Sequence, residues 1–128
     1  MERRLYQRVP VRVSAMVTTK DGVRIKAVAV DVSSGGLGIE CHTKQRNMIT
    51  PGGSFVCDGK PVSVFVDLDL SNGVEPSSKI AARCHVVFSR RMSSDQCKIG
   101  LRYADIENDS RECLARFIGQ KAKAISGN

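Results

Sequence analysis

The sequence predicts a domain dominated by β-strands, either an antiparallel barrel or a sandwich, followed by one helix. Apolar and polar residues alternate in six runs, which is the period of half-buried strands. Most of these runs are joined by short turn-forming segments such as Asp21-Gly22 and 93–95. Near the end of the chain the period changes to that of an amphipathic helix. A chain of 128 residues can bury the core of one such domain.

The six runs differ in how regular they are. They lie at residues 9–18, 23–32, 37–42, 62–70, 79–88 and 97–103. The second run becomes almost entirely apolar from Ala27 to Val30, and either a β-bulge or a strand covered on both faces would explain this change. Residues 43–61 lack a clear period, and because a structureless loop of that length is unusual we expect a small extra hairpin there.

The last element is an amphipathic helix over residues 108–126. The sequence from Asp109 to Glu112 has the spacing of a capping box. One face of the helix is then apolar, and it carries Leu114, Phe117, Ile118, Ala122 and Ile125. This stripe has to be buried, most simply against a barrel or across its mouth.

Charge and cysteine content restrict the class of protein. The 20 Lys and Arg residues outnumber the 13 Asp and Glu residues, and the net charge of +7 favours an anionic partner. The five cysteines are an odd number without CxxC spacing and lie mostly in apolar runs, which is typical of a reducing cytoplasm. No apolar run has the length of a signal peptide or membrane span, so we expect a cytoplasmic protein.

The amino-terminal stretch from Glu2 to Arg8 contains Arg3, Arg4 and Arg8. The planar guanidinium fork can donate two bonds to guanine O6 and N7 or pair with phosphate. Arginines at this spacing are also common as solvated charge. Taken alone, the stretch is therefore a weak signal.

A turn from Asp31 to Gly36 follows the second predicted strand. The Asp31 carboxylate could accept from guanine N1–H and N2–H, and the Ser33 hydroxyl could bond to phosphate, ribose or backbone. Gly35 and Gly36 could take positive φ and let a ligand approach closely. The ordinary alternative is a strand connection with an Asx-type bond.

Together, the two stretches closely resemble the motifs of the PilZ domain family, RxxxR and (D/N)xSxxG. Here they read Arg4-x-x-x-Arg8 and Asp31-x-Ser33-x-x-Gly36. The sequence from Lys98 to Tyr103 is similar to the family's late strand, in which an Ile-Gly pair precedes an apolar or aromatic residue. The closing helix also lies where the family places one.

The resemblance implies a six-stranded antiparallel β-barrel that binds cyclic di-GMP, with no further cofactor. Arg4 and Arg8 would contact guanine and phosphate. A second wall would contain Asp31, Ser33 and the paired glycines Gly35 and Gly36. Arg3 resembles family members that take up two intercalated ligand molecules, so one or two molecules per chain are expected.

The same resemblance predicts a single stand-alone domain with a flexible arm at 1–9, a barrel at 10–105 and the helix at 108–126. The arm has few apolar residues, so we expect the ligand to order it over the turn. The changed surface would then signal to a protein partner.

Three other functions are alternatives to a cyclic di-GMP receptor. A small basic barrel could bind single-stranded nucleic acid, but the chain has no Trp, and its six Phe and Tyr residues are scattered. A PilZ-like module that has lost its ligand would not be expected to keep both motifs intact. An enzyme is not predicted, because no Ser or Cys lies in a recognisable nucleophile elbow.

A zinc site is a further alternative, suggested by Cys41-His42 and Cys84-His85. Adjacent residues of a strand face opposite sides of a sheet, and neither pair has the usual spacing of zinc ligands. Core cysteines with surface histidines are the favoured interpretation, and no metal is expected.

Overall fold

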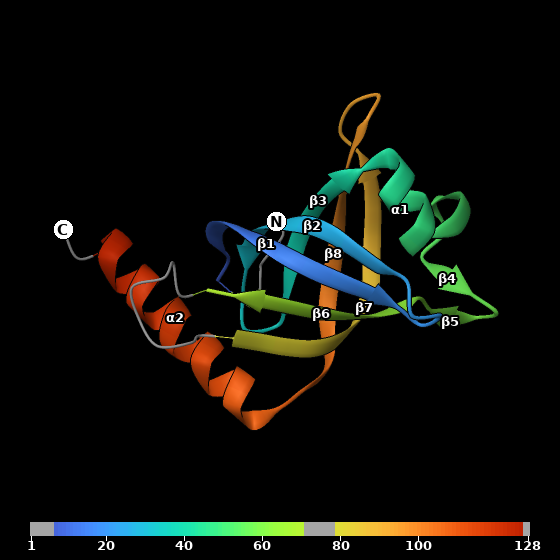
Figure 1. Ribbon diagram of the computed structural model, residues 1–128. Helices are drawn as coiled ribbons and strands as arrows, with labels where there is room; N and C mark the ends of the chain where they lie inside the picture. The colour runs from blue at the N-terminus through green and yellow to red at the C-terminus, as the bar shows by residue number, and fades with distance from the viewer. Residues whose placement is uncertain (1–6, 71–78, 127–128) are drawn as a thin grey trace.

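The computed structural model describes residues 7–70 and 79–126, and side chains as far as Lys121. Its main feature is a closed antiparallel barrel with the strand order β1-β2-β3-β8-β7-β6 (Figure 1). The six barrel strands are β1 (Val9–Thr19), β2 (Arg24–Val32), β3 (Gly36–His42), β6 (Ser63–Asp69), β7 (Lys79–Arg91) and β8 (Gln96–Ile106). The predicted six-stranded barrel is confirmed, and the sandwich alternative is excluded.

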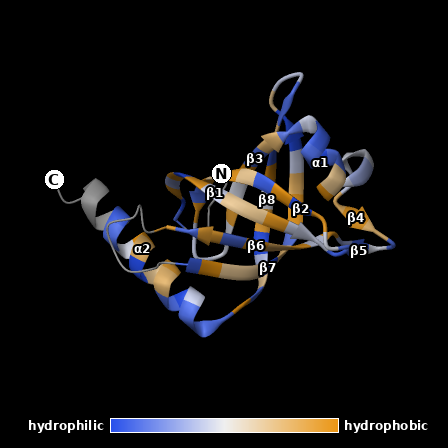
Figure 2. Ribbon diagram, viewed as in Figure 1, coloured by the Kyte–Doolittle hydropathy of each residue, from blue (hydrophilic) through white to orange (hydrophobic). Residues whose placement is uncertain are grey.

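The barrel interior is filled by aliphatic side chains from all six strands. Val17, Ile39 and Ile99 are completely buried, whereas polar residues alternate with them along the strands (Figure 2). Fully burying such a side chain contributes roughly 1.5–3 kcal/mol to stability. Val9 is also buried and pairs with Val32, so the barrel begins inside the segment predicted as an arm.

Residues 43–61 form a second, smaller group of elements at one end of the barrel. They comprise α1 (Thr43–Ile49), a 3-10 turn η1 (Pro51–Gly53) and a hairpin of β4 (Val56–Cys57) and β5 (Lys60–Pro61). The predicted extra hairpin is confirmed. The helix α1 was not predicted, because a helix this short covers too few turns to show its period in the sequence.

The closing helix α2 (Asn108–Ser126) packs against β7 and β1 at the other end of the barrel (Figure 1). Leu114 is buried, and Phe117 and Ile118 pack against the core, as the apolar stripe predicted. The predicted capping box is wrong, since Asp109 already lies in the first turn of the helix. The buried hydroxyl of Ser110 instead accepts a hydrogen bond from Ala81 N at 3.0 Å.

In the part of the chain that the structure describes, no helix is both long and apolar enough to cross a membrane. The cysteines are all free thiols. Cys41, Cys84 and Cys97 are buried, whereas Cys57 is exposed in the small hairpin.

The cysteine environments lead to a test of the barrel core. Burial raises the pKa of Cys41 to about 11 and that of Cys84 to about 12. Because the thiolate is the reactive form, iodoacetamide at about pH 8 should modify Cys57 readily and leave Cys41 and Cys84 unmodified in the native protein. Peptide mass spectrometry measures this, with protein unfolded in urea as the control. Equally fast modification of Cys84 and Cys57 in native protein would contradict the closed core.

Candidate ligand-binding site

The position of Asp31 depends on a bulge in β2. Ala29 pairs with Ile39 of β3, but Asp31 pairs with Gly38, so Val30 is an extra residue in the ladder. Without it, the two-residue period would point Asp31 into the core on the same side as Ala29. The bulge reverses the alternation and places Asp31 on the outer surface of the barrel. Of the two explanations for the apolar run in this strand, the structure shows the bulge.

Two cations hold the carboxylate of Asp31. Arg8 Nη1 lies 3.1 Å from Oδ1, and Lys98 Nζ of β8 lies 3.2 Å from Oδ2. The Asp31 side chain is only 14% exposed, compared with 41% for Arg8 and 21% for Lys98. The last residue of the RxxxR motif is therefore in direct contact with the first residue of the turn motif.

Gly38 provides the space in which this ion pair lies. A β-carbon on Gly38 would stand 2.8 Å from Asp31 Oδ2 and 3.1 Å from Lys98 Cε. In the ladder, Lys98 is opposite Glu40, yet its ammonium reaches past the bare glycine to Asp31. Because Gly38 has no side chain, the Lys98 ammonium can reach Asp31 on β2, even though the residue itself lies opposite Glu40 in the ladder.

Ser33 shapes the turn that follows. Its Oγ accepts hydrogen bonds from Gly35 N at 3.2 Å and Gly36 N at 3.1 Å, and it donates to the carbonyl oxygen of Gly36 at 3.2 Å. A hydroxyl has one donor and two acceptor positions, so its hydrogen-bonding capacity is fully used within the turn. In this structure Ser33 acts on the shape of the turn and has no bond left for another group.

The two glycines of the turn are held against β8. Gly35 O accepts a hydrogen bond from Tyr103 N at 3.0 Å. A β-carbon on Gly36 would collide with the carbonyl oxygen of Leu101. The expected positive φ is wrong, because neither Gly35 nor Gly36 has a left-handed backbone. The turn requires glycine at position 36 for close approach to the neighbouring strand.

Tyr103 packs beside this turn. Burial raises the pKa of the Tyr103 hydroxyl above its ordinary value, and the nearby Cys84 and Asp31 side chains raise this pKa further through their ionised forms. The hydroxyl has no hydrogen-bond partner among the described residues. The buried Tyr103 hydroxyl therefore stays protonated at neutral pH.

The described residues include only some of the predicted site residues. It places Arg8, Asp31, Ser33, Gly35 and Gly36 together at one end of the barrel. Arg3 and Arg4 lie outside the described residues. Sequence analysis missed the roles of Lys98 and Gly38, because their contact with Asp31 joins three different strands and leaves no signal at a fixed spacing.

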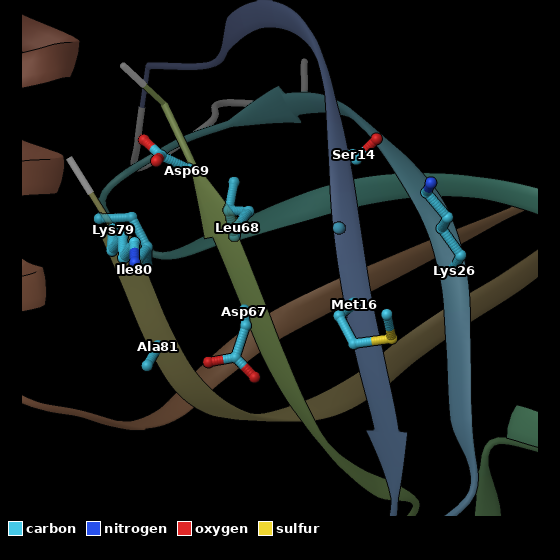
Figure 3. A pocket seen from close by; sticks show the side chains of 10 residues that line it. Ser14, Met16, Lys26, Asp67, Leu68, Asp69, Lys79, Ile80 and Ala81 are labelled. Carbon is cyan, nitrogen blue, oxygen red and sulfur yellow. The ribbon is translucent and has the colours of Figure 1, made fainter. Parts of the chain in front are cut away.

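A cavity of about 480 Å³ lies elsewhere on the surface, across β1, β2, β6 and β7 (Figure 3). Its lining includes Met16, Lys26 and Asp67, and it shares no residue with the turn motif. Its charged lining consists of two carboxylates, Asp67 and Asp69, and two ammonium groups, Lys26 and Lys79, none of which belongs to the ion pairs around Asp31. The cavity is therefore not a continuation of the site around Asp31.

The histidines and cysteines do not converge. Cys84 is buried in the core, whereas Nε2 of the half-buried His85 lies 3.3 Å from Arg83 Nη1 on the other face of β7. Within residues 7–70 and 79–121, no three His, Cys, Asp or Glu side chains are grouped so that they could hold a metal ion.

The comparison with protein families agrees with the two motifs. The model of the PilZ domain matches residues 2–120. This chain belongs to the PilZ domain family. A comparison with curated protein sequences finds no match.

Solved structures of PilZ proteins have the same fold at low sequence identity. The Bacillus subtilis inhibitor of motility MotI/DgrA superposes with a TM-score of 0.67 and 18% identity, over 96% of this chain and 53% of that protein. The PilZ domain of Escherichia coli YcgR, solved with c-di-GMP, gives 0.63 and 10%, over 98% and 96%. The MrkH–c-di-GMP complex of K. pneumonia gives 0.66 and 15%, over 100% and 56%. The chain therefore spans about half the length of MotI and MrkH.

The two glycines that face away from the core should respond differently to substitution. Gly36→Ala places a methyl group against the backbone of β8, which cannot move without opening the barrel, and should lower the free energy of unfolding by about 3 kcal/mol. Gly38→Ala meets only the ends of two flexible side chains and should cost about 1 kcal/mol while displacing Lys98 from Asp31, because Arg8 still pairs with the carboxylate. Urea unfolding of both variants measures the difference. Equal destabilisation would contradict this assignment.

Proposed function

We propose that this chain is a receptor for cyclic di-GMP that binds one or two molecules of the ligand between its amino-terminal arm and the turn from Asp31 to Gly36. The observation that carries the proposal is the contact of Arg8 with Asp31 at 3.1 Å, in a chain that belongs to the PilZ domain family. It joins the two family motifs in space. The YcgR and MrkH structures that share this fold were solved with c-di-GMP.

The chemistry of the site suits an anionic guanine ligand. Arg8 can grip phosphate or the guanine O6 and N7 edge, and the acceptors of Asp31 suit guanine N1–H and N2–H. Arg4 and Arg3 are proposed to add further guanidinium groups. Binding of a second intercalated ligand molecule is proposed to depend on Arg3. These groups bind and orient, so the proposed role is recognition without catalysis.

The proposed output is a change in the arm. Arg8 is held at the turn by one ion pair with Asp31, whereas the turn itself is fixed to β8 by backbone bonds. A ligand that bridges the arginines and the turn would order the arm at some cost in affinity and create a new surface. That surface is proposed to signal to a protein partner.

Calorimetric titration with cyclic di-GMP tests the receptor. The unsubstituted protein should bind, and Arg8→Ala should weaken binding roughly 10- to 100-fold, because hydrogen bonds to charged groups contribute about 1.5–3 kcal/mol. Arg24→Ala is the matched control, since Arg24 is exposed at the opposite end of β2 and should leave binding unchanged. The titration also reports whether one or two molecules bind.

The rival function is binding of single-stranded nucleic acid, which the net charge of +7 would favour. Filter binding to oligonucleotides at physiological salt distinguishes the two functions. Tight binding of oligonucleotides together with no heat of binding for cyclic di-GMP would overturn the proposal.

Amide hydrogen exchange tests the proposed arm. Exchange in residues 3–8 should slow by about tenfold or more when saturating cyclic di-GMP is added, because ordered amides are protected from solvent. The core strand β8 serves as the internal control and should change little. Equal exchange in the arm with and without ligand would show that ligand binding does not order it.

A further inference from the structure

We infer that Lys98 is a positioning residue that keeps the charge of Asp31 compensated when Arg8 turns from Asp31 to the ligand. This inference rests on the proposed function, and it concerns how the same site is prepared for binding. Its starting point is the arrangement of one carboxylate between two cations, with Arg8 on Oδ1 and Lys98 on Oδ2.

The two cations differ in how they are anchored. Lys98 lies within β8, where its backbone is opposite Glu40 in the ladder with β3. Its side chain is only 21% exposed. Arg8 lies before the first residue of β1, and its side chain is 41% exposed. Lys98 is therefore the fixed partner of Asp31, and Arg8 is the partner that can leave.

Moving Arg8 away from Asp31 would be costly in free energy if Arg8 were the only cation beside the carboxylate. The carboxylate is 14% exposed, so water compensates its charge poorly once a guanidinium has moved away. With Lys98 in place, Oδ2 keeps its partner while Oδ1 becomes free to accept from a ligand. Each carboxylate oxygen has two acceptor positions, so Lys98 does not occupy the whole of Oδ2.

The surrounding residues are arranged for this role. Lys98 has a carboxylate directly opposite it in Glu40, yet its ammonium lies 3.2 Å from Asp31. The stem can cross β3 because Gly38 has no side chain, and a β-carbon there would stand 3.1 Å from Lys98 Cε. The Asp31 carboxylate is thus held in place by three features, which are the bulge at Val30, the missing side chain of Gly38 and the ammonium of Lys98.

A double-mutant cycle in cyclic di-GMP binding tests this role. Lys98→Met should weaken binding about tenfold, because Arg8 then has to remain near Asp31 or leave it without a cation. In an Asp31→Asn background there is no carboxylate to compensate, so adding Lys98→Met should change affinity less than about twofold. The family motif (D/N)xSxxG accepts Asn at this position, so binding should remain measurable.

Controls separate this role from others. Lys20→Met removes the same charge from the exposed β1–β2 turn, at the far end of β2, and should leave binding unchanged.

A tenfold loss that persists in the Asp31→Asn background would show that Lys98 contacts the ligand itself, and would overturn the inference. Unchanged binding by Lys98→Met in an otherwise unsubstituted protein would also overturn it, leaving the receptor function intact. If the unsubstituted protein does not bind cyclic di-GMP, the receptor function fails, and this role of Lys98 fails with it.

Discussion

One extra residue in β2 determines on which side of the barrel wall a charge lies. Val30 interrupts the ladder between Ala29 and Asp31, and the side chains on either side of it therefore face opposite ways. Val32 then returns to the core with 1% exposure. A regular strand would bury a carboxylate among aliphatic side chains, which costs several kcal/mol unless the charge is paired. The fold and the site thus depend on the same irregularity.

The barrel supplies rigidity to one side of the site only. Ser33 closes its turn with its own hydroxyl, and Gly35 and Gly36 are fixed to β8 by a backbone bond and a close contact. Arg8 is joined to this wall through a partly exposed ion pair, a class of interaction that is weak in water. A ligand bound here as proposed would meet one preformed wall and would compete with Asp31 for Arg8.

The sequence predicted those features that follow from local period. Alternation predicted all six barrel strands, and the stripe through Leu114 predicted the buried face of α2. The apolar run from Ala27 to Val30 left a bulge and a strand covered on both faces as alternatives, of which the structure shows the bulge. The pairing of the two motifs predicted which residues would meet at the turn, and for Arg8 the structure shows the contact. For the strands and the helix, neighbours in sequence carry the signal, whereas the two motifs were connected by the family resemblance.

The features that escaped prediction join separate strands. The contact of Lys98 with Asp31 depends on the register of β3 with β8, on the bulge in β2 and on the missing side chain of Gly38. The requirement for Gly36 likewise comes from the backbone of Leu101, far along the chain, and not from its own φ. A motif read from sequence therefore says which residues belong to a site but not why each is needed. Ser33 and Gly36 shape the wall, Asp31 carries the charge, and Lys98, outside the motif, determines how freely that charge can exchange its partner.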